Sequence, residues 1–232
     1  LIAAKESPCP TRKVGFGESC DLKISNVEYL PTGSCFVIEG EAYEVPMVGE
    51  FNVRNAAMAV CSARFAGLEP EEIRRGLLSF EGIARRQQER GEVRGITVVD
   101  DFAHHPTAIG LAIDGLRQKY PSRRLWVVFE PRSNTTRRNI FQDDLAMALK
   151  KADCVVIPSI PHPEKVAENE RLDPEKLVAD ISSAGAHSWH LGEVEEIVEH
   201  VSSLAQSGDV IAILSNGGFG GIHEKLLTSL SD

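Results

Sequence analysis

Cysteine and positive charge are scarce in this 232-residue sequence. Its five cysteines are widely spaced and form no Cys-x-x-Cys pair, which argues against a zinc site and against a disulfide framework. Reduced thiols in a cytoplasmic protein are the simplest interpretation. The formal net charge of −9 argues against a broad nucleic-acid surface, although a few arginines would suffice to bind a phosphorylated small molecule.

Long hydrophobic runs are also missing. No run approaches the roughly 18 apolar residues of a membrane-spanning helix, and no signal peptide is visible. The composition, 42% hydrophobic and 25% charged, is ordinary for a globular protein and allows one large or two small domains. We therefore expect neither a nucleic acid nor a membrane as a partner.

The spacing of apolar residues divides the chain into two parts, with a Gly- and charge-rich boundary segment at 81–91. We expect domains at 1–84 and 85–232. In the first, the pattern predicts strands and then helices at 23–27, 35–38, 42–47, 52–65 and 70–79. In the second, it predicts strands at 96–100, 125–130, 154–158, 187–190 and 210–214, separated by helices at 107–119, 139–151, 174–183, 194–206 and 221–230. Such alternation is typical of an α/β, Rossmann-like fold, a mostly parallel sheet with helices on both faces.

Titratable residues gather directly after one expected strand, where segment 100–107 reads DDFAHHPT. Ligands of open α/β sheets bind beyond the carboxyl ends of strands. A carboxylate there, such as Asp101, can accept ribose hydroxyls, and an imidazole such as His104 can orient a phosphate or help to bind a metal. The simpler alternative is that Asp101 or Thr107 caps the following helix.

Four other segments carry candidate binding groups. Asn52 and Asn55 are three residues apart and share one face of a helix, where their amides could contact a purine or hold a loop. Arginines in 85–90 could clamp a phosphate, or the segment could be a solvated linker. Segments 129–138 and 214–223 both follow strands, and the four glycines of the second suit an anion-binding loop. For these two segments, the alternatives are a plain loop and a tight strand–helix connection.

Together these segments resemble the Mur ligases, the amide-forming enzymes of peptidoglycan synthesis. Gly49, Asn52 and Asn55 are similar to a pattern in the family's central domain. The Arg85-Arg86 pair, followed by Asp101 and His104, resembles its hinge arginine and C-terminal-domain aspartate. Segments 100–109, 130–135 and 215–223 resemble the branch that joins the murein tripeptide, L-alanyl-γ-D-glutamyl-meso-diaminopimelate, to UDP-N-acetylmuramate in peptidoglycan recycling.

The resemblance implies a reaction in which ATP phosphorylates the muramate carboxylate and the tripeptide amine attacks the resulting acyl phosphate. It places Asn52 and Asn55 near adenine, Arg86 near the phosphates and Asp101 at the ribose. It gives His104 the catalytic role. It also implies a set of substrate-binding residues: Arg132, Ser133, Asn134, Ser215, Asn216 and His223. Arg132 is the expected partner of a peptide carboxylate, because a guanidinium pairs with carboxylates bidentately.

One departure from the family is large. The sequence contains no G-x-x-x-x-G-K-[ST] motif, which the Mur ligases carry in their central domain, and no counterpart of their UDP-sugar domain. The chain is therefore expected to hold the back part of a partial α/β central domain, 1–84, and a whole C-terminal domain, 85–232. It is expected to be inactive alone. The Mg²⁺ ligands are expected in the missing part of the central domain and none in this chain. The missing N-terminal and P-loop segments of the same protein would be its partners.

Three alternatives remain open. The amine substrate could be L-alanine instead of the tripeptide. The chain could be a non-catalytic module that binds a nucleotide or peptide. A metal-dependent hydrolase built on Asp100, Asp101, His104 and His105 is disfavoured, since neighbouring side chains of a strand point to opposite faces.

Overall fold

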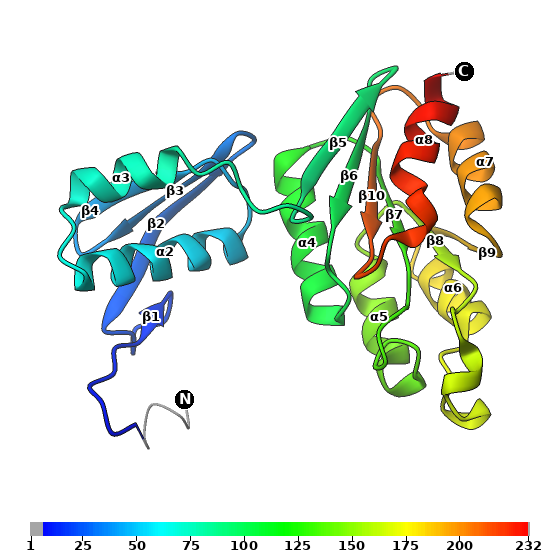
Figure 1. Cartoon of the computed structure of the whole chain (residues 1–232), viewed down its shortest axis with the longest axis horizontal. Coiled ribbons are helices and arrows are strands. Elements are labelled where there is room, and N and C mark those ends of the chain that lie inside the picture. Colours follow the sequence, from blue (N-terminus) through cyan, green and yellow to red (C-terminus); the bar gives the residue numbers. More distant parts are fainter. Residues whose placement is uncertain (1–6, 232) are drawn as a thin grey trace. The chain divides into compact units, whose positions relative to one another are not determined.

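A computed structural model describes residues 7–231, and the chain divides into two units between Gly82 and Ile83 (Figure 1). We call residues up to Gly82 unit 1 and those from Ile83 unit 2. The sequence-based domain boundary lies two residues later, between Ala84 and Arg85. Each unit has its own sheet and its own hydrophobic core.

Unit 1 is a four-stranded sheet with two helices. The order is β1-β2-β3-β4; β1 pairs parallel with β2, and the other pairs are antiparallel. Its elements are β1 (Val14–Gly15), β2 (Leu22–Leu30), β3 (Gly33–Ile38), β4 (Glu41–Val45), α2 (Glu50–Phe65) and α3 (Pro70–Leu78). Alternate residues of β3 and β4, including Phe36, Ile38 and Tyr43, pack against Val53 and Val60 of α2. All five expected elements of this half of the chain are present.

Unit 2 is a six-stranded sheet in the order β5-β6-β10-β7-β8-β9, in which only β5 runs antiparallel to its neighbour. The strands are β5 (Gln88–Val93), β6 (Ile96–Asp101), β7 (Leu125–Phe129), β8 (Cys154–Pro158), β9 (His187–Leu191) and β10 (Val210–Leu214). The helices are α4 (Pro106–Lys119), α5 (Gln142–Leu149), α6 (Pro174–Ser183), α7 (Val194–Leu204) and α8 (Ile222–Ser231). Short 3₁₀ turns lie at Asn139–Phe141, Pro163–Lys165, Glu168–Glu170 and Phe219–Gly221.

Helices cover both faces of this sheet, as the alternation of strands and helices predicts (Figure 1). Val99 lies in the core formed with α4, α5 and α6, whereas its neighbour Val98 lies in the core formed with α7 and α8. Both residues are fully buried, because a strand covered on two faces hides its odd and its even side chains alike. The predicted Rossmann-like, mostly parallel α/β fold is confirmed.

The short strand β1 was not among the expected elements, and the structure differs from the sequence-based expectation at two further places. Segment 81–91 was expected to contain the domain boundary, with a solvated linker as one alternative for 85–90, but its residues 88–91 belong to the edge strand β5. The charged side chains that made it resemble a linker are those that an edge strand carries on its open side. The helix expected over 139–151 begins as a 3₁₀ turn, becomes α5 only at Gln142 and ends at Leu149.

Candidate functional site

Three neighbouring strands of unit 2 end at the same level. Asp101 of β6 and Phe129 of β7 both lie in register with Leu214 of β10. The helices that follow β6 and β7 cover one face of the sheet, and α8, which follows β10, covers the other. Adjacent strands whose connections leave on opposite faces form the crevice where α/β proteins bind ligands. The candidate residues of unit 2 lie at or just beyond these three ends.

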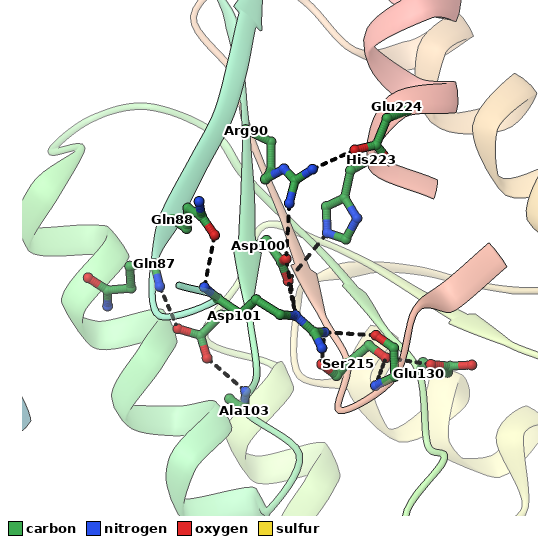
Figure 2. Close-up of polar contacts among 12 residues, drawn as sticks. Gln87, Gln88, Arg90, Asp100, Asp101, Ala103, Glu130, Ser215, His223 and Glu224 are labelled. Carbon is green, nitrogen blue, oxygen red and sulfur yellow. Dashed lines mark hydrogen bonds and ion pairs between the residues drawn. The ribbon is translucent and has the colours of Figure 1, made fainter. Parts of the chain in front are cut away.

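Asp100 is the centre of a buried ionic cluster on the α8 side of the sheet (Figure 2). It is 2% exposed, and its carboxylate lies 3.2 Å from Arg85 Nε, 3.8 Å from Arg90 Nη1 and 3.4 Å from His223 Nε2. Burial lowers the pKa of His223, and the nearby Asp100 carboxylate opposes that shift. Arg90 also pairs with Glu224, the residue after His223. This cluster joins β5 and β6 to the start of α8.

Asp101 points to the opposite face and is equally buried. Its Oδ2 accepts a hydrogen bond from the backbone N–H of Gln87 (2.9 Å), and its Oδ1 accepts one from Ala103 (2.7 Å; Figure 2). Burial raises the pKa of this carboxyl, and the two backbone hydrogen bonds oppose the rise. In the structure Asp101 therefore holds the chain directly after Arg86, and it is 2% exposed where a ribose contact would need an open face. That contact stays a prediction.

The two histidines of the cluster have different surroundings. The half-buried His104 donates from Nδ1 to the Phe102 carbonyl (2.9 Å), and its other ring nitrogen, Nε2, takes no part in this contact. The exposed His105 is the N-cap of α4, and its Nδ1 accepts from the Thr107 N–H (3.3 Å). The alternative in which Asp101 or Thr107 caps this helix is therefore wrong.

The two hinge arginines also differ. Arg85 is half-buried, whereas Arg86 is exposed, with its guanidinium over the Phe102 ring at 5.5 Å from the centroid. No carboxylate among residues 7–231 pairs with Arg86. Its charge is free for an anionic ligand. The run of arginines does not reveal this difference; only the alternation of side chains along the segment hints at it.

The loop after β7 presents Arg132 to solvent. Arg132 is exposed and makes no ion pair within the described part of the chain. Ser133 and Asn134 make internal contacts instead: Ser133 Oγ accepts from the Thr136 N–H (3.0 Å), and Asn134 Oδ1 accepts from Arg137 Nη2 (2.5 Å). These two residues shape the loop, and Arg132 is the member of the predicted trio that is left available.

The glycine-rich loop after β10 is tied to the end of β7. Ser215 donates from Oγ to the buried Glu130 carboxylate and accepts from the Gly217 N–H at 2.9 Å (Figure 2). The Oδ1 atom of Asn216 is buried and accepts no hydrogen bond from residues 7–231. Buried acceptors are nearly always satisfied, so this oxygen is suited to receive a donor from a ligand.

The two asparagines of unit 1 lie near the start of α2. Asn52 is buried and donates from Nδ2 to the Val48 carbonyl (2.8 Å), so it holds the loop before the helix. Asn55, one turn further, is exposed and free to contact a ligand. Contact of either residue with adenine stays a prediction.

Within residues 7–231 there is no group of three or more His, Cys, Asp or Glu side chains that could hold a metal ion. Asp100 and Asp101 face opposite sides of β6, as the argument against a hydrolase site requires. In the same part of the chain, no helix is both long enough and apolar enough to cross a membrane.

Comparison with known sequences identifies the relatives of this chain. The family model "Mur ligase, glutamate ligase domain" matches residues 85–217. A UDP-N-acetylmuramate–L-alanyl-γ-D-glutamyl-meso-2,6-diaminoheptandioate ligase from Escherichia coli is 44% identical over 80% of this chain and 38% of its own length. A UDP-N-acetylmuramate–L-alanine ligase from Bifidobacterium longum is 36% identical over 84% of this chain and 38% of its own length.

Solved structures agree. A murein peptide ligase from Psychrobacter arcticus is 33% identical, with a TM-score of 0.66 over 95% of this chain and 46% of that protein. A UDP-N-acetylmuramate–alanine ligase from Thermotoga maritima, at 17% identity and a TM-score of 0.76, shares the fold. The chain spans less than half the length of these relatives. Because the family model covers more than half of it, the chain belongs to the Mur ligase family.

Proposed function

We propose that this chain is part of an ATP-dependent ligase that joins the murein tripeptide to UDP-N-acetylmuramate in peptidoglycan recycling, in the cytoplasm. The observation that carries the proposal is Arg132 beside the switch point of the sheet, an exposed guanidinium that has no ion pair among residues 7–231. Either amine carries a carboxylate with which this guanidinium could pair. The 44% identity to a tripeptide ligase favours the tripeptide.

In the proposed reaction, the γ-phosphoryl group of ATP is transferred to a carboxylate oxygen of UDP-N-acetylmuramate, and ADP leaves. The tripeptide amine attacks the carbonyl carbon of this acyl phosphate, inorganic phosphate leaves, and an amide forms. The attacking amine must lose a proton. His104 is our candidate base, because the hydrogen bond from Nδ1 to Phe102 leaves Nε2 able to accept that proton.

Each unit offers one exposed group suited to ATP: Arg86 in unit 2 for phosphate and Asn55 in unit 1 for adenine. Asn52 and Asp101 would act indirectly, each within its own unit, since both are buried and hydrogen-bonded to backbone. Magnesium would supply charge neutralisation at the transferring phosphoryl group. The described residues contain no cluster suited to hold it, so we assign it no step here.

The proposed tripeptide site includes five further residues, which contribute in two ways: Ser133, Asn134, Ser215, Asn216 and His223. The buried, unpartnered Oδ1 of Asn216 would accept a hydrogen bond from the peptide. The other four support the site through contacts within unit 2, since their side chains already have partners there or, for His223, are buried against Asp100.

The test is a titration of the 232-residue chain with the tripeptide and, separately, with L-alanine, followed by NMR. We expect the tripeptide to shift the backbone amides around Arg132 and Asn216, and R132Q to weaken binding about tenfold. The matched control is R138Q, which removes a nearby arginine already paired with Glu170. An equal response to L-alanine would favour the alternative that the 36% identical relative represents. The absence of any tripeptide response would contradict the proposal.

A further inference from the structure

Arg85 connects the start of unit 2 to the glycine-rich loop. Its Nε lies 3.2 Å from Asp100 Oδ2, and its Nη2 donates to the carbonyls of Ser215 (2.7 Å) and Gly217 (2.8 Å). One guanidinium therefore spans from the end of β6 to the loop after β10. Its planar fork can satisfy a carboxylate and two carbonyls at once, which an ammonium group cannot do in a fixed geometry.

The backbone of Arg85 is fixed as firmly as its side chain. Its N–H donates to Gln88 Oε1 (2.9 Å), and its carbonyl accepts from the Phe102 N–H (2.8 Å). Its φ of 60° lies in the left-handed region, which costs a non-glycine residue free energy unless the surroundings compensate. Five hydrogen-bonding partners hold Arg85, so the guanidinium has little freedom to leave the loop.

The loop that Arg85 holds carries the side chain of Arg132 on its surface. A β-carbon built on Gly217 would lie 2.2 Å from Arg132 Nη1 and 2.7 Å from its Cδ. Arg132 therefore lies directly against the α-carbon of Gly217, and only glycine leaves room for it there. A side chain at position 217 would therefore force the Arg132 side chain to move.

We propose that Arg85 is a positioning residue: by fixing the turn Ser215–Gly217 it sets the orientation of Arg132 for the carboxylate of the amine substrate. The ligand in this inference rests on the proposed function, whereas the mechanical link from Arg85 to Arg132 does not. The two hinge arginines then have different tasks, with Arg85 acting on the peptide side and the exposed Arg86 available for phosphate.

Unit 2 contains a matched control for the loss of a buried ion pair. Arg124, 35% exposed, pairs with the buried Asp209 near the amino-terminal end of β10, just as Arg85, 31% exposed, pairs with Asp100 at the carboxyl end of β6. Both substitutions R85Q and R124Q remove a cation from a buried carboxylate and should lower stability, R124Q by more, because Asp100 keeps Arg90 whereas Asp209 has no second cation among the described residues. Only Arg85 contacts the loop.

The experiment compares wild type, R85Q, R85K and R124Q in the 232-residue chain by NMR. We expect R85Q to shift the Gly217 amide and the Arg132 Nε–H resonance, and to weaken tripeptide binding about tenfold. R124Q should change the melting temperature without moving either resonance or the dissociation constant. R85K keeps the charge beside Asp100, so it should fold, yet it should still disturb both resonances because it cannot bridge the two carbonyls.

Two outcomes would overturn the inference: R85K or R85Q leaving the Arg132 resonance as in wild type, or R124Q disturbing it equally. If R85Q does not fold, R85K decides. If wild type binds no tripeptide, the proposed function fails, and the two resonances still test the link between Arg85 and Arg132.

Discussion

Asp100 and Asp101 are neighbours with opposite surroundings. Asp100 lies among Arg85, Arg90 and the imidazole of His223 on the α8 side, whereas Asp101 accepts two backbone N–H groups on the α4 side. Arg85, which faces inward, and the exposed Arg86 also differ, although they precede β5 and do not lie in a strand. At this site, a residue's face on its strand decides its role as much as its chemistry does.

The pH dependence of stability should report on His223. Burial lowers the pKa of this imidazole from 6.5; Arg85 and Arg90 act in the same direction, and Asp100 and Glu224 oppose it. Because the folded-state pKa is below the unfolded value, the unfolded chain takes up the proton first as the pH falls. We expect the free energy of unfolding to decrease below about pH 6.5, by at most about 1.4 kcal/mol per pH unit from this group.

Denaturant unfolding of wild type and H223Q between pH 5 and 8 measures this effect. H223Q should show a smaller loss of stability toward low pH. The control H187Q removes an exposed histidine and should retain the wild-type slope. A slope unchanged in H223Q would show that the proton is taken up elsewhere.

At the scale of elements, the site depends on connections between strand ends. Arg85 joins β6 to the loop after β10, and Ser215 joins that loop to Glu130 after β7. Loops are usually the mobile parts of a fold. Here side-chain contacts from two neighbouring strand ends restrain the loop. We therefore interpret its glycines as allowing other groups to approach the backbone closely, and not as making the loop mobile.

Two adjacent glycines of this loop allow a sharp test. A β-carbon at Gly217 would collide with Arg132, whereas one at Gly218 would meet no atom within 4 Å, and Gly218 has an ordinary φ of −82°. We expect G217A to displace Arg132 and weaken tripeptide binding about tenfold, and G218A to bind as wild type. Isothermal titration measures both. Equal affinities for the two variants would contradict the close contact between Gly217 and Arg132.

At the scale of the whole molecule, the chain contains candidate binding groups, and its sequence lacks the motif of a phosphate-binding loop. Its sequence has no G-x-x-x-x-G-K-[ST] motif, and it spans 38% of the E. coli relative. The backbone N–H groups and lysine of such a loop hold the β- and γ-phosphates in P-loop enzymes. We therefore propose that the 232-residue chain binds substrate without catalysing ligation by itself.

A phosphate-release assay with ATP, UDP-N-acetylmuramate and tripeptide measures this directly. We expect release at the rate of the protein-free blank, with or without the amine. Release that depends on both substrates would show that the chain carries a complete active site.

Much of the fold was predictable because hydrophobic periodicity is a local signal. The ranges 154–158, 174–183 and 210–214 match β8, α6 and β10 residue for residue. Strand β5 was not predicted, because an edge strand is stabilised by pairing with a neighbouring strand, and the apolar pattern within the edge strand does not show that pairing. The sequence likewise located the site at the strand ends without distinguishing Arg85 from Arg86.

The sequence by itself determined the fold class, the family and the segments that form the candidate site, since these follow from local patterns and motifs. Only the tertiary structure decided what each side chain contacts. Asp101 and Asn52 bind backbone, Arg85 holds the loop, and Arg132 remains free. The physical reason is that hydrogen-bond partners 130 residues apart, such as Arg85 and Ser215, meet only when the sheet has formed.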